Sequence, residues 1–506
     1  MRFPVLAKNL QTDVRPLRNI LQQLLTYSMR SCDVGQVISV DTLPDDILLA
    51  VFDYHVNDYS QHLTVGEKAW QSLVHVCRRW RSIVFASPRH LNLQLVCKDG
   101  TPAKDALDIW PAFPLIIWCP GDYRTGSVDN IIAVLERRGR VRLITLADVQ
   151  SSDLEILLTA MQQPFSELTH LSLHCLGKTV PVDPDLFLGG YAQRLEYLLL
   201  EGIPFPGLPK LLLSASHLVR LHLFDIPHSG YISPDVMVTA LSSLTSLSSF
   251  SLKFQSPRSC PDRASRRPPP STRTVLPILT RLRFKGVAEY LEELVARIDA
   301  PRLNQLYIAL FNDITFDTPQ FIQFISRLPT SRELEKVHLS IRNRDASLRF
   351  SSRTSDDGDV YVEILCQGLD WQLSSLEQVC TSCLPPLSML EDLYAYEDRD
   401  SQPDWKADIE NGVWLQLLHS FTAVKNLYLS EELALHIGPA LQELVDGRTM
   451  EVLPALQTIY LEGLESSGPV QEGIAKFVAA RQVASRPIAV SSWADSDSDK
   501  VSYYGV

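Results

Sequence analysis

The chain has 506 residues, of which 45% are hydrophobic and 21% charged, with a net charge of −12 and nine cysteines. This balance is ordinary for a folded protein, and its acidity argues against a general nucleic-acid binder, which needs an excess of basic charge. No run approaches the roughly 20 apolar residues that a membrane span needs. The odd number and irregular spacing of the cysteines favour a reducing compartment, cytoplasmic or nuclear.

Residues 1–40 are an N-terminal extension without the continuous apolar core of a signal peptide. Residues 41–91 follow as a helical module, which opens with Pro44 in a position that suits the first turn of a helix. Apolar residues recur at helical spacing in three runs, which cover 47–52, 69–77 and 80–85. Pro88 ends the third run. We therefore predict three short helices around a small, marginal core.

The helical module resembles the F-box. The pattern of that family opens with Leu-Pro, continues through an apolar helix that ends near a Phe, and closes on a Val-Cys-Arg-x-Trp-like stretch. The chain has these features in order, at Leu43, Pro44, Ile47, Leu48, Phe52, Val76, Cys77, Arg78, Trp80 and Arg81. The stretch DYHVNDYSQHLTVGEKAW makes the link between the first and second helices longer than in the family.

The resemblance implies that the module binds the Skp-type adaptor of a cullin-based ubiquitin ligase. The residues implied in this docking are Leu43, Pro44, Ile47, Leu48, Phe52, Val76 and Trp80, and the first five of them are expected to be partly exposed. The alternative is that these apolar side chains form only the core of the module itself.

Residues 92–490 carry a returning pattern, apolar-x-x-apolar-x-apolar. It runs from VRLITL at 141–146 to LQTIYL at 456–461, with successive copies 23 to 34 residues apart and a degraded copy, VEILCQ, at 362–367. Each copy alternates like a short strand, and helix-like stretches lie between copies. This period predicts an α/β, leucine-rich-repeat-like solenoid, with parallel strands on the concave side and helices on the convex side. The usual Asn after the strand is missing, so the repeats are divergent.

The residue between the last two apolar positions of each copy is expected to lie on the open face of the sheet. The later members of this column are basic or aromatic, which favours a recognition face for a protein target. The substrate-face candidates are Arg283, Tyr307, His338, Tyr394, Tyr428 and Tyr460, with Arg281, Lys285, Lys336, Asp392, Tyr396 and Asn426 as neighbours. The alternative is that tyrosines simply suit strands.

Three polar stretches interrupt the repeats and predict surface loops, at 255–274, 343–359 and 396–408. The first is rich in Pro, Ser and Arg. Residues 491–506 are polar and acidic and are expected to form a disordered tail.

The sequence has no GxGxxG, GxSxG or HExxH motif, so we predict neither catalytic nor cofactor-binding residues. Cys380 and Cys383 form the only CxxC, with no second pair and no nearby histidine, so no metal site is predicted. We expect no enzyme activity, no cofactor, and neither a nucleic-acid nor a membrane partner.

Taken with the F-box resemblance, these features favour a substrate-recognition adaptor of a Skp–cullin–F-box type ubiquitin ligase, which would bridge the Skp-type adaptor and cullin to a protein target. Stretches such as FPGLPKLLLSA, IPHSGYISP and FTAVKNLYLS resemble a large F-box family of mushroom-forming fungi, the basidiomycetes. The alternative is a leucine-rich-repeat interaction scaffold unconnected with ubiquitin. A hydrolase would require a convergent polar site, which no motif indicates.

Overall fold

The chain is described by a computed structural model, in which it divides into two compact units, Met1–Leu171 and Ser172–Val506. The structure describes residues 43–58, 63–97, 103–119, 128–176, 187–205, 207–261, 272–311, 318–329, 334–352, 359–366, 368–382, 387–397, 410–445, 447–463 and 469–493. The predicted N-terminal extension, 1–40, lies outside these residues. No helix within the described ranges has the length and apolar character to cross a membrane.

The described part of the first unit, from residue 43, begins with three helices. They are α2 (Asp45–Asp58), α3 (Leu63–Val74) and α4 (Arg78–Ala86). Strand–helix repeats follow as β1 (Leu95–Cys97), α5 (Ala103–Ile109), β2 (Leu115–Cys119), α6 (Val128–Leu135), β3 (Val141–Gln150) and α7 (Ser151–Ala160). Strands β1, β2 and β3 pair in parallel.

An aromatic cluster joins the helices of the first unit to its repeats. The ring of Trp70, on α3, lies 5.1 Å from Trp110 and 5.5 Å from Phe113, and Phe85, on α4, lies 5.9 Å from Phe113. Buried aromatic pairs of this kind stabilise a core beyond their buried area. The compact unit therefore extends from the helical module to residue 171, well past the predicted module boundary at residue 91.

The second unit repeats a strand and a helix along the chain. Strand β4 (His170–Leu176) crosses the boundary between the units, and the strands of the second unit are β5 (Tyr197–Glu201), β6 (Arg220–Ile226), β7 (Ser249–Phe254), β9 (Arg281–Gly286), β11 (Gln305–Phe311), β12 (Lys336–Ile341), β13 (Ala346–Ser351), β14 (Asp359–Leu365), β15 (Asp392–Glu397), β16 (Asn426–Leu429), β17 (Thr458–Glu462) and β18 (Ala489–Trp493). The helices are α8 (Leu208–Ser214), α9 (Pro234–Leu241), α10 (Ala288–Arg297), α11 (Pro319–Ser326), α12 (Leu369–Ser382), α13 (Asn411–His419), α14 (Glu431–Gln442) and α15 (Pro469–Val483). A separate pair of short strands joins β8 (Thr274–Val275) to β10 (Ile298–Asp299).

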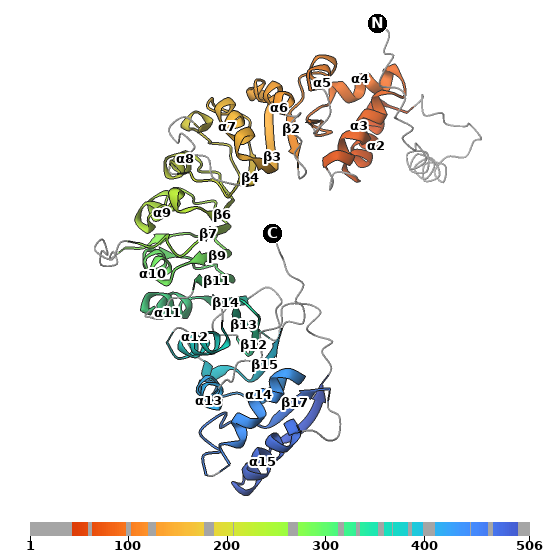
Figure 1. The fold of residues 1–506 in the computed structure, drawn as a ribbon. Helices are drawn as coiled ribbons and strands as arrows, with labels where there is room; N and C mark the ends of the chain where they lie inside the picture. Colours follow the sequence, from red (N-terminus) through yellow and green to blue (C-terminus); the bar gives the residue numbers. More distant parts are fainter. Residues whose placement is uncertain are drawn as a thin grey trace, which may run out of the picture. The chain divides into compact units, whose positions relative to one another are not determined.

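The sheet of the second unit has the strand order β5-β6-β7-β9-β11-β14-β13-β12-β15-β16-β17-β18. All neighbours are parallel except β13, which is antiparallel to both β12 and β14. Figure 1 shows α8 to α13 stacked along one side of these strands. This arrangement confirms the predicted α/β class, with a largely parallel sheet and helices between the strands.

Alternation along each strand separates the core from the open face. In β9, Leu282, Phe284 and Gly286 are buried, while Arg281, Arg283 and Lys285 alternate with them on the other face. A Cβ atom at position 286 would lie 2.5 Å from the ring of Phe284, so a larger residue there would force this buried ring to shift. The same packing by alternate residues gives the leucine-rich strands one buried face throughout.

The predicted loop at 343–359 is wrong for residues 346–351, which form β13. The segment ASLRFS alternates, and its apolar residues Ala346, Leu348 and Phe350 are buried. As a result β14 lies beside β11, and β12 lies beside β15, so the strand order departs from the chain order. The predicted tail is also wrong at its start, because residues 491–493 complete β18. Residues 494–506 lie outside the described residues, as do 262–271 and 398–408 within the other two predicted loops.

Candidate interaction surfaces

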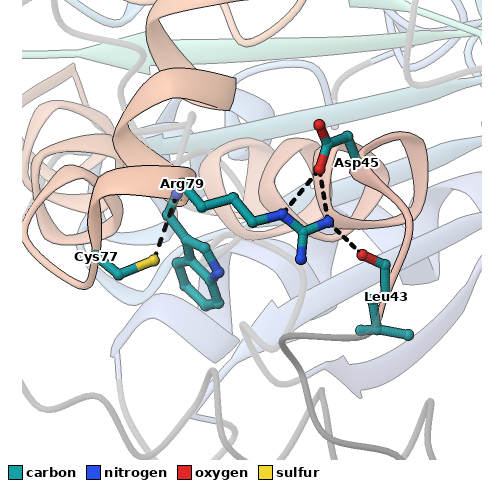
Figure 2. A network of polar contacts seen from close by, with 5 residues as sticks. Leu43, Asp45, Cys77 and Arg79 are labelled. Carbon is teal, nitrogen blue, oxygen red and sulfur yellow. Dashed lines mark hydrogen bonds and ion pairs between the residues drawn. The ribbon is translucent and has the colours of Figure 1, made fainter.

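Arg79, which lies on α4, fastens that helix to the N-terminal end of α2, as Figure 2 shows. Its Nη2 atom donates to the carbonyl oxygen of Leu43 at 2.5 Å and to Asp45 Oδ1 at 2.6 Å, and its Nε atom donates to the same carboxylate oxygen at 3.0 Å. Cys77 caps α4, where its sulfur accepts the amide N–H of Trp80 at 3.5 Å. The Leu-Pro opening and the Cys-Arg-Arg-Trp closure of the sequence pattern are therefore parts of one structural unit.

The seven predicted docking residues divide by burial. Leu48 and Phe52 have no exposed surface, and Trp80 is 6% exposed, with its ring 4.7 Å from that of Phe52. The prediction that Leu48 and Phe52 lie partly exposed is wrong, because they form the core of the module itself. The remaining four keep accessible apolar surface, with Leu43 half-buried and Pro44, Ile47 and Val76 exposed.

The predicted column forms a row across the sheet of the second unit. Strand register aligns Leu199, His222, Ser251, Arg283 and Tyr307 on the first strands of this unit, and His338, Tyr394, Tyr428 and Tyr460 on later ones. Tyr361 on β14 and Arg349 on β13 occupy the row between Tyr307 and His338. The sequence pattern did not reveal these two residues, because β13 was predicted as a loop and the repeat copy in β14 was placed too late, at 362–367. The alternation at Val360, Val362 and Ile364 was the available signal.

Stacked rings form the later part of this row, which we call the aromatic row: His338, Tyr394, Tyr428 and Tyr460. Neighbouring ring centroids lie 4.6, 4.1 and 4.4 Å apart, and their planes are within 8° of parallel. Trp493, at the end of β18, sets its ring edge-on to Tyr394 and Tyr428 at 6.2 and 5.7 Å. These rings are half-buried, so they present a rigid aromatic surface on the open face.

Tyr307 and Tyr361 form a second stacked pair, with ring centroids 4.7 Å apart. The hydroxyl of Tyr307 donates to Glu363 Oε2. Burial and the nearby Glu363 carboxylate raise the pKa of Tyr307 well above its usual range, and burial raises the pKa of Tyr361 to about 12. Both hydroxyls therefore remain protonated near neutral pH.

Basic side chains gather on the same face over β6, β7 and β9. We call them the basic cluster: Arg220, Lys253, Arg281, Arg283 and Lys285. His222 lies among them. Burial is the main cause that lowers the pKa of His222 to about 4, and the positive charges of Arg283 and Arg220 add to it. Its imidazole is therefore neutral at physiological pH, and Nδ1 lies 3.0 Å from Ser251 Oγ.

No family model matches this sequence, and neither does any curated protein. Among solved structures, the chain is similar to the leucine-rich repeat-containing protein LegL7 from Legionella pneumophila, at 13% identity and a TM-score of 0.25. The alignment covers 76% of this chain and 97% of that protein. A TM-score this low does not support an argument about the fold. The repeat architecture of this chain is therefore inferred from its own strand register.

Proposed function

We propose that this chain is a substrate-recognition adaptor of a Skp–cullin–F-box type ubiquitin ligase. In this proposal the helical module docks on the Skp-type adaptor, and the open face of the sheet in the second unit binds a protein target. The chain has no catalytic role of its own. It raises the effective concentration of the target near the ubiquitin-loaded enzyme, which converts a bimolecular encounter into a local one.

The observation that carries the docking half is the Arg79 contact with Leu43 and Asp45. It fixes the Leu-Pro start of α2 while the apolar side chains of Pro44 and Ile47 stay exposed, 47% in the case of Ile47. Exposed apolar surface held on an ordered helix end is suited to filling a groove on another protein.

Capture of a Skp-type adaptor tests the docking half. Leu43→Ala with Pro44→Ala should abolish capture, because it removes two of the four accessible apolar side chains while leaving the buried Leu48 and Phe52 in place. The matched control is Leu213→Ala with Val236→Ala, since both side chains are exposed on helices of the second unit. Undiminished capture by the first variant would remove the docking proposal.

The target-binding half is supported by the aromatic row, since tyrosine and tryptophan are favoured at recognition hot spots. Replacing Tyr394, Tyr428 and Tyr460 by Ala should change the set of proteins that the chain captures from cells. The triple Phe variant keeps the stacked rings and is the matched control. An unchanged set with the Ala variant counts against this face.

A specific observation favours the second candidate function, an interaction scaffold outside the ubiquitin system. Three of the predicted docking residues, Leu48, Phe52 and Trp80, are buried in the module itself. Such a scaffold would still capture partners through the sheet, but it would bind no Skp-type adaptor. The same capture experiment therefore separates the two functions.

A further inference from the structure

The basic cluster occupies one continuous area of the open face. Arg281, Arg283 and Lys285 alternate along β9 and so share that face, and strand pairing places Lys253 on β7 directly opposite Lys285. Arg220, on β6, lies in the row of Arg281, two strands away. Neighbouring strands are about 4.8 Å apart, and alternate residues about 6.8 Å apart. The charges therefore cover roughly 10 Å across the strands and 14 Å along β9.

The cluster is not neutralised by the residues that the structure describes. None of its five side chains forms an ion pair or hydrogen bond with them; the ammonium group of Lys253 lies 4.5 Å from the ring of Phe224, and that of Lys285 lies 5.8 Å from the ring of Phe311. By contrast, Arg349, Arg342 and Lys425, on later strands or beside them, pair with Asp359, Asp345 and Glu391.

Carboxylates also lie near the cluster. The carboxylates of Glu201 and Asp225 interact electrostatically with the Lys253 ammonium group. Glu363 interacts in the same way with Lys285, and it also accepts a hydrogen bond from the Tyr307 hydroxyl. Burial, Arg283 and Lys285 nevertheless lower the pKa of Lys253 below its usual value. Unbalanced positive charge on a chain of net charge −12 marks a place where an anionic group would be attracted.

We propose that the basic cluster binds an acidic segment of the protein target, extended along β9, with carboxylates at alternate positions. An extended peptide presents alternate side chains at about the 6.8 Å spacing of Arg281, Arg283 and Lys285, so one face of the segment meets three cations. The proposal rests on the proposed role of this sheet in target binding, and it adds the chemical class of the target.

A protein segment fits this area better than a nucleic acid does. A duplex needs an extended basic surface to neutralise many phosphates, whereas these charges cover only about 14 Å by 10 Å of an otherwise acidic chain. The stacked rings of Tyr307 and Tyr361, in the same row as Arg283, offer aromatic surface beside the cations.

The test is binding of a short labelled peptide with aspartate at alternate positions to the full chain. The peptide should bind more weakly as salt rises, and the variant Arg281→Gln, Arg283→Gln, Lys285→Gln should lose roughly tenfold or more in affinity. The control variant Arg302→Gln, Arg327→Gln, Arg486→Gln removes the same charge from exposed positions outside the strands and should bind as the unmodified chain does. A peptide with asparagine in place of aspartate should not bind.

If the β9 variant and the control variant bound the peptide equally well, the proposal would be overturned. Displacement of the peptide by a short DNA that carries the same number of negative charges would also overturn it. A peptide with its aspartates at adjacent positions that binds equally well would overturn the extended pairing along β9. The Leu43→Ala, Pro44→Ala variant should keep peptide binding. Adaptor capture that persists in this variant therefore contradicts the docking half, whereas an unmodified chain that captures the adaptor but does not bind the peptide contradicts this inference.

Discussion

At the scale of single residues, two arginines, Arg79 and Arg481, fasten elements together through backbone carbonyls. Arg481, on α15, is fully buried and donates to the carbonyl oxygens of Thr449, Leu453, Pro454 and Leu456 at 3.1 to 3.4 Å. It thereby holds α15 to the turn before β17. The sequence places Arg481 on a helix, but it does not reveal these acceptors, because they come from an irregular turn about 25 to 32 residues away.

Replacing Arg481 by Lys should destabilise the last repeats. A lysine ammonium lacks the planar fork and leaves several buried carbonyl groups without a donor, which costs about 2–3 kcal/mol. Denaturant unfolding measures the loss. Arg486→Lys, at an exposed position near the end of the same helix, is the control, and its change should stay within about 0.5 kcal/mol. Equal stabilities for the two variants would contradict the role given to Arg481.

His222 should make stability depend on pH in the acidic range. Its folded pKa of about 4 lies below the ordinary histidine value near 6.5, so the unfolded chain binds the proton more readily between these values. Stability should therefore fall as pH drops from about 6.5 to about 4, by at most about 3 kcal/mol, and by less after solvent screening of this partly exposed ring. Urea unfolding across this range should show a shallower slope for His222→Gln than for the exposed control His228→Gln. Identical slopes would contradict the environment described for His222.

At the scale of elements, regular repeats were predictable and the inserted strand was not. The hexamers marked strands β3 to β7, β9, β11, β12 and β15 to β17, and alternation placed Tyr394, Tyr428 and Tyr460 in one row. The sequence could not reveal that β12, β13 and β14 run back and forth, because the polar residues around 342–345 suggested a loop and pairing partners are set by the whole sheet. Arg349 was missed for the same reason, whereas Tyr361 was missed because the repeat copy in β14 was placed at 362–367.

Hydrogen exchange tests the inserted strand directly. Strand β13 is paired on both sides, so the amides of Ala346–Ser351 should be as protected as those of β12 and β14. Asn343 and Arg344, which are exposed in the turn before β13, are the internal reference and should exchange fast. Fast exchange throughout 346–351 would contradict the strand and favour the loop that the polar composition suggested.

At the scale of the whole molecule, the chain assigns its two surfaces to different compact units. The helical module belongs to the unit that ends at residue 171, and the aromatic row and basic cluster belong to the other. Both surfaces were predicted from the sequence, but the prediction overestimated the apolar area available at the proposed docking surface. An amphipathic pattern does not tell whether an apolar face meets a partner or its own neighbours, and here Phe52 meets Trp80.

The central claim is that the start of α2 is a docking edge for a Skp-type adaptor. Hydrogen exchange of the full chain, with and without a purified Skp-type adaptor, tests it most directly. We expect a stable complex with new protection at residues 43–48 and 76–79, and unchanged exchange over β6, β7 and β9. Absence of a complex, or protection that falls on the sheet of the second unit and spares the start of α2, would contradict it.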